Sequence, residues 1–291
     1  MVVAAMLRGC GGRMLQRRMS TVASGTRAIN GFNMFYMTNG ERGMPLLCMP
    51  GALGTAETDF LPQLEHLADT FQVVSYDPRG YGKSRPPVRD FPLDFYQRDA
   101  DDAAALMAAL GHEQYGVMGW SDGAISSVLL SAKYRPQVKG LVMFGGNAYF
   151  TQSDVDAFEA TRDIEKNWSK RMKETHIPTY GDDLQPMWSA AVDAWAGIYR
   201  TKGGDVCMEE AKSLTCPTLV LHGAKDPICL IDHPHWFKEN IKDAQLHILP
   251  DGKHNLHIRY AEEVNALVRN FFTTGKAHPQ RAFKIARIQT G

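Results

Sequence analysis

The sequence predicts an α/β fold, with a mostly parallel sheet of eight strands and a helical cap inserted into it. Three observations lead to this prediction: short apolar runs alternate with helix-like segments, an Asn-Gly turn opens the pattern, and a long helical stretch interrupts it. Alternation favours parallel strands, because each helical crossover returns the chain to the same end of the sheet. The 291 residues fit one large α/β domain or two small ones.

The first two expected strands form a hairpin. In "TRAINGFNMFYM", Asn30 and Gly31 separate two apolar stretches, and both residues tolerate the positive φ angles of a tight turn. We expect this hairpin to be the antiparallel edge of the sheet. The other six strands are expected in the runs "PLLCMPG", "FQVVSYD", "YGVMGWS", "VKGLVMFGG", "CPTLVLHGAKD" and "AQLHILPDGKH".

Helices are expected between these strands and, above all, in the middle of the chain. The clearest is "QRDADDAAALMAALG", where Ala104, Met107 and Leu110 share one face and Gly111 suits the C-terminal stop. From residue 147 to about residue 213 the alternation lapses, which predicts a helical cap over the carboxyl edge of the sheet. Packing between helices explains each aromatic residue of this stretch singly, but together they favour an apolar pocket wall. They are Tyr149, Phe150, Trp168, Tyr180, Trp188, Trp195 and Tyr199.

The two ends of the chain differ in composition from the rest. The first 26 residues contain four arginines and no acidic residue, and apolar residues, Ser and Thr surround the arginines. This pattern resembles a mitochondrial transit peptide, with a disordered basic tail as the alternative; we expect a mitochondrial protein. Its removal would change the formal net charge from 0 to 0 − 4 = −4. The expected organisation is a transit peptide (1–26), a core in two parts (27–146 and 214–272), the cap (147–213) and a basic C-terminal extension (273–291).

Charge and cysteine content exclude several function classes. The 32 basic and 32 acidic residues cancel, so no net field attracts nucleic acid or a membrane surface. No apolar run reaches the roughly 18 residues that would span a bilayer. The five cysteines are scattered without a Cys-x-x-Cys pair, so we expect reduced thiols, with neither a disulfide framework nor a zinc site.

The pentapeptide "GWSDG" is the main functional signal. Ser121 follows an apolar run and precedes a helix-like one, which is the strand–turn–helix setting of a nucleophile elbow. The sharp turn lifts the serine hydroxyl clear of the sheet, and Gly119 and Gly123 avoid side chains that would clash with neighbouring strands. The alternative is a glycine-bracketed serine that only caps the helix.

A serine hydroxyl needs a base, and the base needs an orienting carboxylate. In a fold with such an elbow, both follow the serine in the order acid, then histidine. His254 follows the last expected strand across an Asp-Gly turn, and Asp226 leaves the preceding strand at the same edge. His257 is the rival base but falls inside an expected helix, and Asp251 is the runner-up acid, which the Asp-Gly turn already explains. The predicted triad is Ser121, Asp226 and His254.

An oxyanion hole needs two backbone N–H donors. We expect one at Asp122, directly after the serine. The other is expected on the loop "MPGALG" after the third strand, at Ala52 or at Leu53. We also assign Leu53 to substrate binding.

These motifs together resemble the α/β-hydrolase fold over residues 27–272, and "DPRGYGKSRPP" matches its Asp-x-Arg-Gly-x-Gly-x-Ser element. More narrowly, "GWSDG", "GGNAY", "EKNWSK" and "PDGKHNLH" resemble the biphenyl hydrolase-like proteins, the valacyclovir hydrolases of mitochondria. The resemblance implies hydrolysis of α-amino acid esters without metal or organic cofactor. It also implies the triad above, with Asp122 binding the substrate ammonium. We expect a monomer whose partners are a small-molecule ester and water.

Two other functions stay open. The same fold hosts carbon–carbon bond hydrolases, but Asp122 beside the nucleophile would repel their anionic dienoate substrates. A non-catalytic small-molecule receptor with an intact triad is the alternative from another class. Dehalogenases and epoxide hydrolases use an aspartate at the elbow, so Ser121 argues against both.

Overall fold

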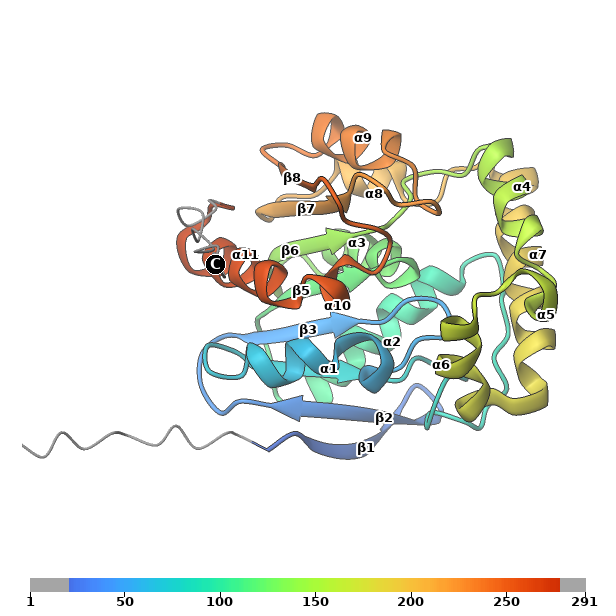
Figure 1. The fold of residues 1–291 in the computed structure, drawn as a ribbon. Helices are drawn as coiled ribbons and strands as arrows, with labels where there is room; N and C mark the ends of the chain where they lie inside the picture. The colour runs from blue at the N-terminus through green and yellow to red at the C-terminus, as the bar shows by residue number, and fades with distance from the viewer. Residues whose placement is uncertain (1–20, 278–291) are drawn as a thin grey trace, which may run out of the picture.

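The computed structural model describes residues 21–277 of the chain. Within this range one eight-stranded sheet lies at the centre of the molecule, in the strand order β1-β2-β4-β3-β5-β6-β7-β8. Helices flank the sheet, and a further group of helices stands beyond the carboxyl ends of the strands (Figure 1). The strands are β1 (Ala23–Ile29), β2 (Phe32–Asn39), β3 (Pro45–Met49), β4 (Gln72–Tyr76), β5 (Tyr115–Trp120), β6 (Val138–Phe144), β7 (Thr218–Gly223) and β8 (Gln245–Leu249).

The opening hairpin is confirmed as the antiparallel edge of the sheet. Asn30 and Gly31 take φ values of 43° and 87°, as a turn that follows the right-handed twist of the strands requires. Strand β1 pairs antiparallel with β2, and β2 pairs antiparallel with β4. Every later pairing is parallel, so the remaining strands all point their carboxyl ends at one edge.

Two apolar clusters form the core, one on each face of the sheet. One contains side chains of α2 and α3, among them Leu106 and Val128. The other contains side chains of α1 and α11, among them Phe60 and Val268. The core helices are α1 (Ala56–His66), α2 (Phe95–Ala109), α3 (Asp122–Lys133), α9 (Asp232–Asn240), α10 (Leu256–Arg259) and α11 (Ala261–Thr274).

Helices fill the interval between β6 and β7, and most of them form a layer at the carboxyl edge of the sheet (Figure 1). They are α4 (Gln152–Ala160), α5 (Ile164–Asn167), α6 (Lys170–Tyr180), a short 3-10 helix (Gly181–Asp183), α7 (Leu184–Lys202) and α8 (Met208–Lys212). The tryptophan rings of this layer pack on one another, with centroids 4.9 Å apart for Trp168 and Trp188 and 5.3 Å for Trp188 and Trp195. Helix α8 differs, because it packs against α3 and α9 of the core.

The expected end segments meet the described range only at their borders. Strand β1 begins at Ala23 and pairs with β2 along its whole length, so a transit peptide of 26 residues would remove half of that strand. Helix α11 runs to Thr274, two residues into the expected C-terminal extension. Residues 1–20 and 278–291, which hold most of both expected segments, lie outside the described residues.

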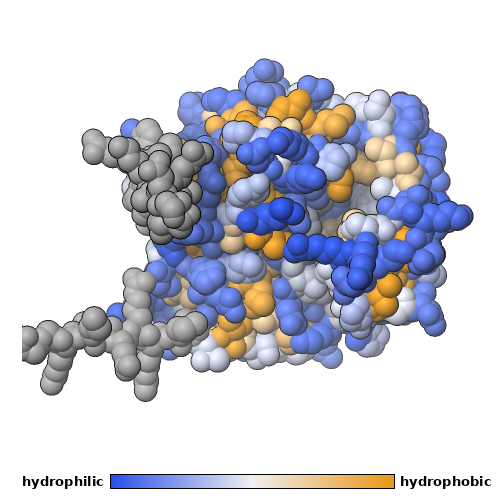
Figure 2. Space-filling model, viewed as in Figure 1, coloured by the Kyte–Doolittle hydropathy of each residue, from blue (hydrophilic) through white to orange (hydrophobic). Residues whose placement is uncertain are grey.

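The surface around this core is mixed. In the space-filling view, hydrophilic residues alternate with separate apolar patches over the face shown (Figure 2). None of the helices in the described part of the chain combines the length and apolar character of a membrane span. Residues 21–277 also hold no group of three or more His, Cys, Asp or Glu side chains arranged to bind a metal ion.

Candidate active site

Ser121 lies at the turn between β5 and α3, at the carboxyl edge of the sheet. Its φ and ψ are 56° and −124°, a conformation that a residue with a side chain adopts only where its surroundings hold it. A Cβ atom on Gly123 would collide with the carbonyl oxygens of Met49 and Pro50, at the end of β3. One on Gly119 would collide with the carbonyl of Gly123 itself, so its crowding comes from α3 and not from a neighbouring strand. The turn therefore has the geometry of a nucleophile elbow.

The three residues predicted as a triad form one hydrogen-bonded chain. His254 Nε2 lies 3.1 Å from Ser121 Oγ, and His254 Nδ1 lies 2.8 Å from Asp226 Oδ2. Asp226 follows β7 and His254 follows β8, two neighbouring parallel strands, so both loops reach the same edge as the elbow. Because the carboxylate accepts a hydrogen bond from the Nδ1–H group, the proton of the neutral imidazole stays on Nδ1 and Nε2 is left free to accept the serine proton.

Asp226 is held as a permanent anion. The side chain is 1% exposed, and its Oδ1 accepts the N–H groups of Ile228 and Cys229 at 2.9 and 3.0 Å. Burial alone would raise the pKa of Asp226, but the charge and hydrogen bond of His254, with these two N–H donors, lower it below its usual value. A stable carboxylate fixes the orientation of the imidazole.

The loop that carries His254 is fixed by two residues that the sequence did not single out for this purpose. Trp120 Nε1 donates to the His254 carbonyl oxygen at 2.8 Å. Gly145 has a φ of 63°, and a Cβ there would approach His254 Cε1 to 3.0 Å. The only cue was their neighbourhood: Trp120 precedes the serine, and Gly145 opens "GGNAY".

The alternative base, His257, and the alternative acid, Asp251, do not join the triad. His257 is fully buried among aromatic rings, with centroids 4.8 Å from those of Trp120 and Phe144, and burial lowers its pKa to about 3. Asp251 lies at the surface and pairs with Lys225 at 2.5 Å. Neither is hydrogen-bonded to the serine–histidine pair.

The oxyanion loop, residues 50–54, lies beside the elbow. Gly51 N–H donates to Asp59 Oδ2 at 3.0 Å, and Gly54 N–H donates to the Gly51 carbonyl at 3.1 Å. The Ala52 N–H has no hydrogen-bond acceptor within the described residues. The N–H of Asp122 opens α3 and has no acceptor inside that helix. The N–H groups of Ala52 and Asp122 are therefore available at this edge, and the Leu53 N–H, the alternative that the sequence left open, also has no acceptor within residues 21–277.

Asp122 is partly exposed, yet its carboxylate is largely enclosed. Oδ1 accepts the hydroxyl of Tyr96 at 2.8 Å, whereas Oδ2 is buried without a hydrogen-bond partner. Burial raises the pKa of Asp122 to about 7, although the Tyr96 hydrogen bond and the Arg89 charge lower it. The pKa of Asp122 therefore lies near neutral pH, and its buried Oδ2 has no hydrogen-bond partner among the described residues.

A buried ion pair lies behind Asp122. Arg89 donates two parallel hydrogen bonds to Asp99, both 2.7 Å long, and its guanidinium lies 4.6 Å from the centre of the Tyr81 ring. These three residues and Asp122 line a cavity of about 10 Å³, which is about the volume one water molecule needs. An ester does not fit there.

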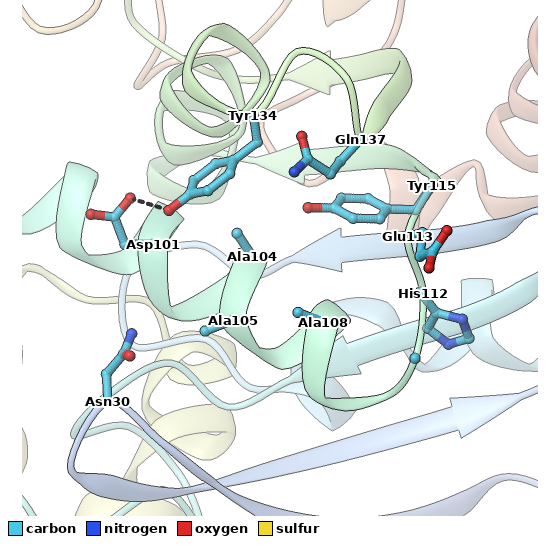
Figure 3. Close-up of a pocket in the computed structure, with 11 residues that line it drawn as sticks. Asn30, Asp101, Ala104, Ala105, Ala108, His112, Glu113, Tyr115, Tyr134 and Gln137 are labelled. Atoms are coloured by element: carbon cyan, nitrogen blue, oxygen red, sulfur yellow. Dashed lines mark hydrogen bonds between the residues drawn. The ribbon is translucent and has the colours of Figure 1, made fainter.

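A groove of about 690 Å³ lies elsewhere and holds none of the triad residues. Its alanine floor comes from α2, and Tyr115 and Tyr134 project over it (Figure 3). Tyr134 donates its hydroxyl to Asp101 at 3.0 Å. Tyr115 is the first residue of β5 and Ser121 follows its last, so the groove lies at the amino edge of the sheet, opposite the elbow.

Comparisons with known proteins agree with this geometry. A family model described as "alpha/beta hydrolase fold" matches residues 44–189. The chain is 41% identical to the serine hydrolase BPHL of Mus musculus over 254 residues, which cover 87% of each protein. It is also 41% identical to the serine hydrolase BPHL of Homo sapiens over 257 residues, again 87% of each.

Solved structures share the fold at lower identity. The 2-hydroxy-6-oxo-6-phenylhexa-2,4-dienoate hydrolase of Rhodococcus sp. strain RHA1 superposes with a TM-score of 0.75 and 16% identity, over 87% of this chain and 99% of the other. A thermophilic esterase of Thermogutta terrifontis superposes with a TM-score of 0.66 and 22% identity, over 89% of this chain and 100% of the other.

Proposed function

We propose, from the premise that this chain belongs to the α/β-hydrolase fold family and is a serine hydrolase related to BPHL, that its substrates are carboxylic esters of α-amino acids. The observation that carries this proposal is the carboxylate of Asp122, next to Ser121, with one oxygen that has no partner. A substrate ammonium is the natural complement of such a group.

The reaction begins at the serine. His254 takes the proton of Ser121 Oγ as the oxygen attacks the ester carbonyl, and the N–H groups of Ala52 and Asp122 stabilise the oxyanion of the tetrahedral intermediate. The intermediate collapses to an acyl-enzyme, and His254 gives its proton to the departing alcohol. Water activated by His254 then attacks the acyl group, which releases the α-amino acid and restores the serine.

Selectivity for the α-amine follows from where the acyl group must sit. The α-carbon is bonded to the carbonyl carbon that Ser121 attacks, so its ammonium reaches the side chain of the next residue. At about 4 Å and an effective dielectric near 20, the attraction between ammonium and carboxylate is on the order of 4 kcal/mol. Desolvation reduces this gain to about 1.5–3 kcal/mol, the usual range for a hydrogen bond to a charged group. Leu53, on the oxyanion loop, is assigned an apolar contact with the substrate.

The carbon–carbon bond hydrolase is a weaker candidate. The dienoate hydrolase named above is 16% identical to this chain, a level at which the likeness concerns the fold alone. An anionic dienoate would meet the Asp122 carboxylate as a like charge. No second function is proposed.

A panel of matched p-nitrophenyl esters tests the proposal. Each α-amino ester is paired with the ester that lacks only the amine, and kcat/KM is measured for the purified chain and for Ser121→Ala. We expect kcat/KM to be about 10- to 150-fold higher for the amino esters. The variant should show neither turnover nor labelling by a fluorophosphonate. Equal rates on both members of each pair would refute the substrate class and leave the hydrolase assignment standing.

We also propose that the chain acts in mitochondria. The arginine-rich, acid-free N-terminus supports this, and the strand that begins at Ala23 moves the proposed cleavage point from after residue 26 to before residue 23. Import into isolated mitochondria should shorten the chain by about 18 to 22 residues. A chain that stays full-length outside the organelle would contradict the proposal.

A further inference from the structure

The oxyanion loop is hydrogen-bonded to the cap through one side chain. Tyr180 is the last residue of α6, and its hydroxyl donates to the carbonyl of Leu53 at 2.7 Å. The same hydroxyl accepts the N–H of Gly82 at 3.2 Å. Tyr180 and Leu53 are 3% and 1% exposed, so neither hydrogen bond competes with bulk water.

The peptide that Tyr180 holds is in an unfavourable conformation. Leu53 has a φ of 59°, a region that a residue with a side chain occupies only when its surroundings enforce it. The Tyr180 ring packs edge-on against Tyr81, with centroids 6.3 Å apart. Both rings belong to one buried apolar cluster with Leu53 and Trp168. The cap therefore fixes both the carbonyl and the side chain of Leu53.

The core holds the other end of the same loop. Asp59 of α1 accepts the Gly51 N–H at Oδ2, and its Oδ1 accepts the Thr58 hydroxyl at 2.8 Å. Gly54 lies so close to this carboxylate that a Cβ there would collide with it. Asp59 and Tyr180 thus fix the loop on either side of Ala52, the expected oxyanion donor.

We infer that Tyr180 is a positioning residue for the oxyanion hole: from the cap it fixes the Leu53 peptide and, with Asp59, directs the Ala52 N–H toward the carbonyl oxygen of an ester at Ser121. The cap, through Tyr180, then helps to stabilise the transition state in addition to covering the substrate. It rests on the triad and the oxyanion loop and is independent of the amine on the substrate.

The test is Tyr180→Phe, which keeps the ring and its packing and removes the hydroxyl. Loss of an oxyanion donor typically lowers kcat by about 10²- to 10³-fold, and a displaced donor should cost less, so we expect kcat to fall by about 10- to 100-fold. KM should change by less than about 3-fold, because acylation and deacylation both pass through an oxyanion and slow together. The loss should be equal for amino esters and for their des-amino partners. Inhibition by a trifluoromethyl ketone, whose adduct with Ser121 carries an oxyanion, should weaken by a similar factor.

A matched control is Tyr134→Phe, which removes the hydroxyl bonded to Asp101 at the opposite edge of the sheet; its kcat should equal that of the parent. Asp59→Asn provides a second variant should Tyr180→Phe fold poorly, and it too should lower kcat with KM preserved. An unchanged kcat in a folded Tyr180→Phe would overturn the inference. So would a loss confined to amino esters, or a lower kcat without weaker ketone binding. Failure of the amino-ester proposal would appear separately, as equal rates of the parent chain on both ester types.

Discussion

Two carboxylates flank the nucleophile, one in the loop after β7 and one at the start of α3, and the protein treats them in opposite ways. Asp226 uses both oxygens, toward His254 and toward two backbone N–H groups, and its pKa is lowered. Asp122 uses one oxygen, toward Tyr96, and burial raises its pKa to about 7. Both lie at the same active site, yet only Asp226 has hydrogen-bond donors on both of its oxygens.

In the proposed function, this difference between the two carboxylates corresponds to two roles: Asp226 orients the catalytic base, and Asp122 binds the substrate. A carboxylate that orients an imidazolium must stay ionised at every working pH, so the fold surrounds it with donors. A carboxylate that binds an incoming cation must keep an oxygen free of other donors; in Asp122 burial of the carboxylate also raises its pKa. In the proposed function, the ammonium of the substrate would supply the positive charge that Asp122 lacks in the free protein.

The largest effect of a single substitution at these two carboxylates is expected at Asp226. Asp226→Asn removes the charge that holds His254 in its working tautomer, so kcat should fall by about 10⁴-fold. The loss should be the same for amino and des-amino esters, because both need the base. Stopped-flow or steady-state hydrolysis of one matched ester pair measures it. A loss that differs between the two esters would mean that Asp226 takes part in recognition.

The position of Asp226 could be predicted from the sequence because it follows from the topology of the sheet. Parallel strands bring the residues after β5, β7 and β8 to one edge, so chain order and a strand-end position were enough to select Asp226 and His254 and to set aside Asp251 and His257. The elbow was equally visible, because a Ser that takes a positive φ between crowded backbones needs the flanking glycines.

The partners of Asp122 could not be predicted, because they depend on packing between segments. Tyr96 and Arg89 come from α2 and from the loop before it, and no spacing in the sequence relates them to residue 122. The same holds for Tyr180 and Leu53, which are 127 positions apart. The core begins with strand β1 at Ala23 and not at the expected residue 27, because this strand has few buried residues and so no apolar pattern to mark its start.

A smaller effect is expected at Tyr96. In the parent chain, the ratio of kcat/KM for an amino ester to that for its des-amino partner should rise as Asp122 ionises with a pKa of about 7, and fall again as the substrate ammonium loses its proton at about pH 7.7–8. Tyr96→Phe removes a hydrogen bond that lowers this pKa, so the carboxyl stays neutral to higher pH. The rise should move upward by about 0.4 to 1 pH unit. The des-amino ester alone should keep its pH profile, and movement of both profiles would contradict the assignment of the titration to Asp122.

The most direct test of the central claim, that Asp122 selects the α-amine, is the matched ester pair measured with Asp122→Asn at one pH above 7. The amide keeps the backbone N–H, the shape of the side chain and an acceptor for Tyr96, and it removes only the charge. We expect kcat/KM to fall by about 10- to 150-fold for the amino ester and by less than about 3-fold for the des-amino ester. An equal loss on both esters would contradict it, because Asp122 would then support the elbow and not the substrate.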